Sequence, residues 1–151
     1  MSHSKETLKG FYKIHHPEKY VGDHTRIIFR SSYELKFMKW CDFTPSVVAW
    51  GSEEVVIPYL SPVDNHIHRY FVDFYIKVKD RNNKVQKYLI EIKPLKFTKE
   101  PPIPKRKTKQ FLHEVITWSV NQAKWKYAKE YCLDRGWQFL ILTEKIGRAH
   151  V

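Results

Sequence analysis

Cysteine, glycine and long apolar runs are all scarce in this sequence, and two of these scarcities exclude a class of protein. The chain has five glycines and two cysteines, Cys41 and Cys132, which lie too far apart to suggest a disulfide framework or a zinc site. No apolar run approaches the ~20 residues that a membrane span needs, and no signal-peptide pattern opens the chain. We therefore expect free thiols in a reducing compartment and no membrane partner.

Aromatic and basic residues, by contrast, are plentiful. Aromatic residues make up 15% and hydrophobic residues 42% of the 151 residues, which predicts one packed globular domain. The formal net charge of +11 indicates a polyanionic partner, most simply nucleic acid. The alternative is an ordinary basic protein without such a partner.

Composition divides the chain into three segments. Residues 1–20 are polar and basic and predict an arm, whereas residues 21–146 carry the patterns of a folded domain. Residues 147–151 show no structural pattern and need not be native. A further basic stretch lies in a proline-rich loop before the last helix, and we expect it, together with one lysine of that helix, to contact DNA phosphates: Lys105, Arg106, Lys107, Lys109 and Lys124.

Turn, cap and periodicity signals predict the order helix, three strands, helix, strand. Ser31 and Glu34 form a capping box that starts the first helix. The other expected elements are a strand near 55–57 ended by Pro58, a hairpin of 68–78 and 87–92, a helix from about 111 to 135 with Leu112, Ile116 and Val120 on its apolar face, and a central buried strand at 137–142. This order predicts an α/β fold with a mixed sheet of about four strands flanked by helices.

Two apolar strand-like runs each carry an acid, Asp73 in the first and Glu91 in the second. A carboxylate in such surroundings costs several kcal/mol unless it is paired. A divalent metal ion is one partner that suits two acids, and Mg²⁺ prefers their hard oxygen ligands. Lys93 shares a strand face with Glu91, where it could orient a water molecule or stabilise phosphate charge. The alternative is that Asp73 pairs with Arg69 while Glu91 and Lys93 form a surface ion pair.

The length of the hairpin turn decides whether the two acids meet. An odd loop centred on Asn82, with Asn83 in the left-handed conformation, sets Asp73 opposite Glu91 on one face of the sheet. A two-residue turn of Asn82 and Asn83 would instead pair Asp73 with Ile92 and place the acids on opposite faces. Both registers remain open at this point.

The sequence Val72-Asp73, followed by Glu91-Ile92-Lys93, resembles the motif of the PD-(D/E)xK nuclease superfamily, with valine in the usual proline position. The stretch 30–35 is similar to the first helix of the branch that contains transposon-end-cleaving endonuclease subunits, in which a helix glutamate joins the metal site. The resemblance implies a restriction-endonuclease-like core and makes Glu34 the third acid, although its capping role needs no metal. It also places a glutamine or lysine of the later helix in the site, and we expect this to be Gln122.

Most of the chain is also similar to a family of head-completion nucleases of T-even-type tailed phages. The stretches that carry this similarity include 30–37, 52–59, 61–64 and 69–73. It implies a Mg²⁺-dependent deoxyribonuclease, with Mn²⁺ as a substitute, that acts on double-stranded DNA before heads join tails. Its expected location is the host cytoplasm or the virion head, where head or portal proteins are further partners. The alternative is a non-catalytic basic adaptor that binds DNA or the portal.

Overall fold

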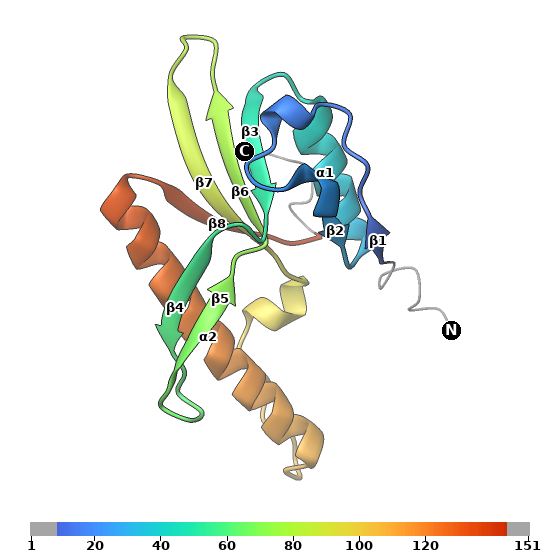
Figure 1. Cartoon of the computed structure of the whole chain (residues 1–151). Coiled ribbons are helices and arrows are strands. Elements are labelled where there is room, and N and C mark those ends of the chain that lie inside the picture. The colour runs from blue at the N-terminus through green and yellow to red at the C-terminus, as the bar shows by residue number, and fades with distance from the viewer. Residues whose placement is uncertain (1–8, 145–151) are drawn as a thin grey trace.

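A computed structural model describes residues 9–144, so the predicted tail at 147–151 lies outside the described residues. A mixed sheet of four strands forms its centre (Figure 1). The sheet order is β3 (Val47–Ser52), β6 (Phe74–Lys79), β7 (Val85–Ile92) and β8 (Gln138–Leu142). The first two pairings are antiparallel and β7 pairs with β8 in parallel. The expected α/β class with a mixed sheet is therefore confirmed.

Two helices cover opposite faces of this sheet. Helix α1 (Ser32–Phe43) packs Phe37 and Met38 against Phe74 and Ile90, and the thiol Cys41 is free and buried in the same core. Helix α2 (Lys109–Arg135) packs against the other face, and its core residues are Trp125, Ala128 and Cys132, packed with Leu89. Cys132 is also a free thiol. The shortest elements are β1 (Gly10–Phe11), β2 (Ile28–Phe29) and the 3-10 helices η2 (Pro17–Lys19), η3 (His24–Arg26) and η4 (Leu95–Thr98).

The predicted strand at 68–78 is two strands in the structure. The chain breaks at Val72 and Asp73, which separate β5 (Ile67–Phe71) from β6. β5 is not part of the central sheet. It pairs with β4 (Val56–Leu60) in a separate two-stranded ribbon beside α2 (Figure 1). Pro58 lies inside β4 and does not end it, because a strand with a neighbour on only one side has a free edge for proline.

Three other sequence expectations need correction. β3 was not expected, and it pairs with β6 at the edge of the sheet. β8 lies at the opposite edge rather than in the middle, and its apolar side chains are only half-buried. The predicted apolar face of α2 is wrong at its first two turns, since Leu112 and Ile116 are about half-exposed, whereas the buried stripe begins at Asn121.

The β6–β7 hairpin has the odd-loop register. Phe74 pairs with Ile90 and Lys79 pairs with Val85, and the backbone N–H of Asp80 donates to the carbonyl of Lys84 at 3.0 Å. Asn83 has φ of 61°, the left-handed conformation that closes such a loop. Extending the register by one residue places Asp73 opposite Glu91. The two-residue turn is therefore excluded.

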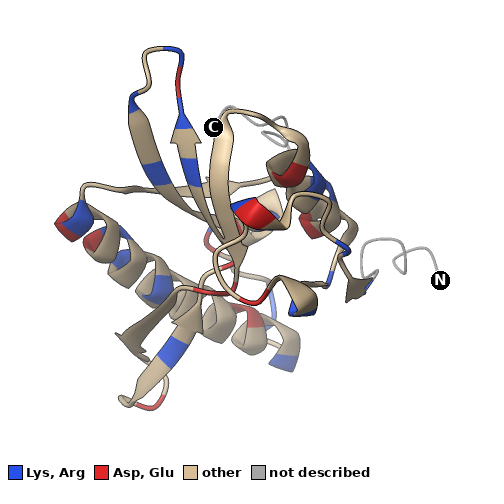
Figure 2. Cartoon of the chain, turned by 45° about the horizontal axis from the view of Figure 1, so that its top comes forward, with Lys and Arg blue, Asp and Glu red and all other residues tan. Residues whose placement is uncertain are grey.

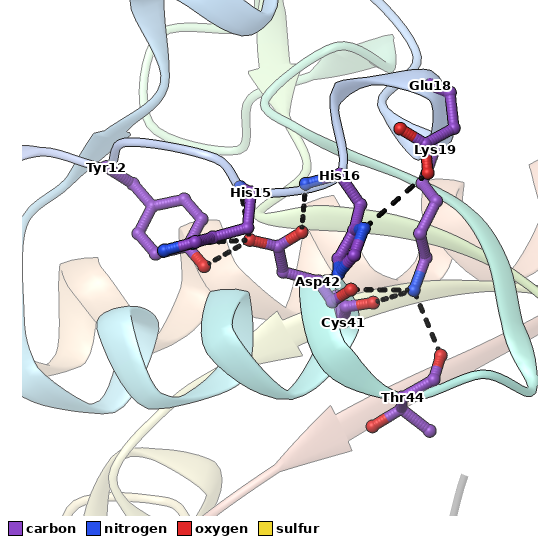
Figure 3. Close-up of polar contacts among 8 residues, drawn as sticks. All are labelled: Tyr12, His15, His16, Glu18, Lys19, Cys41, Asp42 and Thr44. Carbon is purple, nitrogen blue, oxygen red and sulfur yellow. Dashed lines mark hydrogen bonds and ion pairs between the residues drawn. The ribbon is translucent and has the colours of Figure 1, made fainter.

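Residues 9–20 belong to the folded domain rather than to an arm. Asp42, which is 1% exposed at the end of α1, accepts hydrogen bonds from the Tyr12 hydroxyl at 2.6 Å and from the backbone N–H groups of His15 and His16, both at 2.9 Å (Figure 3). Lys19 Nζ donates to three carbonyls where α1 ends, those of residues 41, 42 and 44. A cation there satisfies unpaired carbonyls and complements the helix dipole. The domain thus begins at or before residue 9, and the remainder of the predicted arm lies outside the described residues.

Candidate active site

Asp73 and Glu91 come together where β5 and β6 part. Glu91 is 6% exposed on β7 and faces α2, on the same side of the sheet as Leu89. Asp73 is half-buried just before β6, and the backbone N–H of Ile92 donates to its Oδ2 at 2.8 Å. The Asp73 carboxylate thus accepts a hydrogen bond from the β7 backbone at the point where the chain between β5 and β6 diverges from β7.

Glu91 is held from two sides. The Tyr70 hydroxyl, buried on β5, donates to its Oε1 at 2.5 Å, and Lys93 Nζ lies 3.4 Å from its Oε2. The side chain of Lys93 is 25% exposed, so it reaches from the acid towards solvent. Glu91 and Lys93 are therefore not the solvated surface pair of the alternative interpretation.

Negative charge accumulates at Asp73. Burial, and after it the charge of Glu91, hold the pKa of the Asp73 carboxyl well above its usual range; the hydrogen bond from Ile92 and the charge of Lys93 oppose this only in part. The alternative interpretation pairs Asp73 with Arg69. In the structure, the Arg69 guanidinium instead stacks on the Phe71 ring, 5.4 Å from its centroid. Asp73 is thus a carboxylate with more negative charge around it than local cations balance, and a divalent cation would relieve that excess.

Glu34 has the capping position expected for it and also interacts electrostatically with the acid pair. Its backbone N–H donates to Ser31 Oγ at 3.1 Å, which confirms the helix cap, while its own Oε1 accepts from the backbone N–H of Arg30 at 3.0 Å. Burial raises the pKa of Glu34, and the charges of Glu53 and Glu91 raise it further, against the hydrogen bond from Arg30. Glu34 therefore shares the electrostatic environment of the acid pair.

Asp73, Glu91 and Glu34 do not form a three-ligand metal site in the described part of the chain. Within residues 9–144, no group of three or more histidine, cysteine, aspartate or glutamate side chains lies close enough to hold a metal ion. Each acid is engaged elsewhere: Glu34 with Arg30, Asp73 with Ile92, and Glu91 with Tyr70 and Lys93. The donor chemistry fits a hard cation at Asp73 and Glu91, whereas the structure does not bring Glu34 together with them as a third ligand.

Lys124, not Gln122, is the α2 residue that faces the acids. The Lys124 side chain is half-buried, with Nζ 5.5 Å from the centroid of the Tyr70 ring, and it interacts electrostatically with Glu91 and Asp73. Burial lowers the pKa of Lys124, and the charges of Glu91 and Asp73 oppose this decrease only in part. Gln122 is exposed, because a step of two residues turns a helix by about 200° and so points it away from Lys124. The placement of Gln122 in the site is wrong.

The basic stretch before α2 is exposed throughout, from residue 102 to residue 110. Figure 2 shows lysine and arginine spread along α2 and over the β6–β7 hairpin as well. Positive charge is therefore spread over several elements instead of gathering on one loop. No helix in the described part of the chain is both long and apolar enough for a membrane span.

Local sequence patterns predict neither the contact of Tyr70 with Glu91 nor the contacts of Glu53 near Glu34. Tyr70 sits in the apolar run of Asp73, but its contact with Glu91 depends on the break between β5 and β6, which no local pattern announced. Glu53 has φ of 56° beyond the end of β3, forms an ion pair with Arg30 and donates its backbone N–H to the carbonyl of Asp73 at 3.1 Å. Its positive φ in a non-glycine residue had no signal in the sequence.

The four-stranded mixed sheet with a helix on each face is consistent with the restriction-endonuclease-like fold of a class of nucleases. The chain belongs to the TnsA-like endonuclease N-terminal family, whose model matches residues 44–144. It is also similar to the head completion nuclease of Enterobacteria phage T4, with 43% identity over 135 residues that cover 87% of this chain and 87% of the relative. No solved structure gave a significant match.

Proposed function

We propose that this protein is a metal-dependent DNA endonuclease that acts during phage head completion. The observation that carries the proposal is the convergence of Asp73, Glu91 and Lys93 at the open end of the β6–β7 pair. Mg²⁺ is the expected ion, with Mn²⁺ as a substitute, because both accept carboxylate oxygens. The head-completion role follows from the name of the T4 relative. In such a role the protein would act in the host cytoplasm or at the virion head, in reach of head or portal proteins.

Each residue of the site has a separate task in this proposal. Asp73 and Glu91 would hold the ion, and Glu34 would assist from α1. A bound ion lowers the pKa of water and neutralises phosphate charge. Lys93, next to Glu91, would orient the attacking water, and Lys124 would contact the scissile phosphate from α2. The exposed basic residues at 105–109 would bind flanking phosphates.

Plasmid nicking tests the proposal directly. We expect nicking and linearisation of supercoiled plasmid in Mg²⁺, and none in EDTA. Glu91→Ala and Lys93→Ala should each abolish the activity, whereas Glu18→Ala, an exposed acid on η2, should leave it unchanged. Undiminished nicking by both site variants would remove the catalytic assignment. Parallel digestion of linear DNA with blocked ends distinguishes endonuclease from exonuclease action.

A non-catalytic adaptor is the second candidate. It is favoured by the lack of a three-ligand metal cluster within residues 9–144. An adaptor would bind DNA or the portal equally well with and without Asp73, and would cut under no metal. DNA binding by Asp73→Ala, measured beside nicking by the wild type in Mg²⁺ and in Mn²⁺, separates the two candidates.

A further inference from the structure

A cavity of about 410 Å³ lies on the α1 side of the sheet, where β7 and β8 end. The side chains of Tyr33, Phe37 and Trp40 line one wall, since residues four and seven positions apart share a face of a helix. The opposite wall consists of the ends of β7 and β8, including Lys93. The volume of the cavity lies in the range of pockets that hold small molecules, which is about 300–1,000 Å³.

The cavity shares two features with the acid site. Lys93 belongs to both, because its Nζ lies 3.4 Å from Glu91 Oε2 while the residue also lines the cavity. Tyr33 of the cavity directly precedes Glu34 in α1. Glu34 in turn interacts electrostatically with Asp73 and Glu91, so Lys93 and the start of α1 connect the cavity to the acid pair.

The chemistry of the lining suits a nucleobase with its phosphate. Phe37 is buried, and its ring lies 5.6 Å from that of Trp40 with a tilt of 36°. Tyr33 is 39% exposed at the edge, so an aromatic surface is accessible. Lys36 and Lys93 add two positive charges for a phosphate. Glu144 also lines the cavity, but one of its carboxylate oxygens accepts from the backbone N–H of Leu95 at 2.7 Å.

We infer that this cavity binds one unstacked nucleotide next to the phosphate that is cut. A base stacks on aromatic side chains only after it leaves the duplex stack. The site would therefore favour frayed ends, flaps and single strands over intact duplex. The inference deepens the proposed nuclease function and rests on it for the position of the cut.

Binding measured in EDTA tests the cavity without cleavage. The probes are a fluorescein-labelled single-stranded oligodeoxynucleotide and the duplex that it forms with its complement, which is long enough to stay paired and has G·C-rich ends that resist fraying. Binding to each is followed by fluorescence anisotropy. We expect Trp40→Leu to weaken binding of the single strand about tenfold, the size of one lost base–aromatic stack, and to change duplex binding less than twofold. Phe11→Leu, which removes an exposed aromatic ring in β1, is the matched control and should change neither. An equal loss on both probes, or no loss, would overturn the inference.

Photocrosslinking of the wild type guards against a variant that does not fold. In single strands that carry one 5-iododeoxyuridine, we expect an adduct on Tyr33, Phe37 or Trp40 from one nucleotide position. Adducts found only outside the cavity would refute the inference. Cleavage of plasmid without a cavity adduct would refute the pocket alone, and an adduct without any cleavage would refute the nuclease proposal alone.

Discussion

The Tyr70 hydroxyl lies 2.5 Å from Oε1 of Glu91, and both side chains are buried. Burial raises the pKa of Tyr70 far above its ordinary value, and the charge of Glu91 raises it further, so the phenol stays protonated and donates. A charge-assisted hydrogen bond of this kind fixes one carboxylate oxygen. The other oxygen, Oε2, is left to face Lys93.

Removal of this hydroxyl is expected to impair metal use rather than folding. We predict that Tyr70→Phe lowers the nicking rate ~10–100-fold and raises the Mg²⁺ concentration for half-maximal rate, because groups that orient a metal ligand typically contribute that much. Rates over a Mg²⁺ titration provide the measurement. Tyr88→Phe removes a hydroxyl that donates to Gln86 and serves as the control. An unchanged Mg²⁺ dependence in Tyr70→Phe would show that the contact is structural only.

Lys124 provides a test of which α2 residue acts in the site. Lys124→Ala should lower single-turnover cleavage ~100-fold, as for loss of one group that stabilises charge in a transition state. Gln122→Ala and Lys126→Ala, both exposed, should stay within about threefold of the wild type. If Gln122→Ala were the impaired variant, the orientation of α2 over the acids would be wrong.

The register of the β6–β7 hairpin can be tested at Asn83. Its φ of 61° suits glycine and strains β-branched residues, so Asn83→Gly should be nearly neutral, whereas Asn83→Val should cost ~1–2 kcal/mol in urea unfolding. Deletion of Val85, the first residue of β7, keeps the three-residue loop closed by Asp80 and Lys84 but shifts every later pair by one, which sets Asp73 opposite Ile92. We expect that deletion to abolish nicking. Full nicking by the deletion variant would contradict the link between hairpin register and site assembly.

The parts of this site that sequence predicts are those governed by local rules. The acids, the lysine two residues after Glu91, and the odd turn around Asn82 follow from strand alternation and turn chemistry, and the observed register agrees with them. The break at Val72 and Asp73 does not follow, because the apolar run passes through it without a glycine or proline. That break sends β5 to β4 and brings Tyr70 to Glu91.

The mistakes on α2 have a different cause. A helix with aromatic and apolar residues on several sides offers more than one plausible buried stripe, and tertiary packing selects among them. Here Trp125 and Ala128 lie against the sheet, which turns Lys124 towards the acids and Gln122 towards solvent. The basic composition of residues 1–20 predicts an arm, whereas the hydrogen bond between buried Tyr12 and buried Asp42 attaches this segment to α1.

The salt dependence of DNA binding can separate the basic loop from other positive regions. Each phosphate contact contributes a slope of ~0.9 to the plot of log affinity against log salt. Alanine at all four loop positions 105, 106, 107 and 109 should therefore lower the slope by up to about 3.6. A matched control replaces four charges on the β6–β7 hairpin, at 77, 79, 81 and 84. A larger change in the hairpin set would place the principal phosphate contacts there.

Asp42 is expected to couple folding to pH. Burial alone would raise its pKa, but the hydrogen bonds from Tyr12, His15 and His16 lower it below the ordinary value. A lowered pKa in the folded state means that the ionised group stabilises the protein above the unfolded pKa of ~3.9, and that this contribution is lost as pH falls through the lower folded value.

We therefore predict that Asp42→Asn lowers the free energy of unfolding by ~3 kcal/mol at pH 7, because two backbone N–H groups would then face an amide that carries its own donors. The difference in free energy of unfolding between variant and wild type should become smaller as pH falls below about 4. Urea unfolding at several pH values measures it, with Glu18→Gln, an exposed acid on the same N-terminal segment, as the control that should shift by less than ~0.5 kcal/mol. A gap independent of pH would mean that Asp42 acts through its shape and not through its charge.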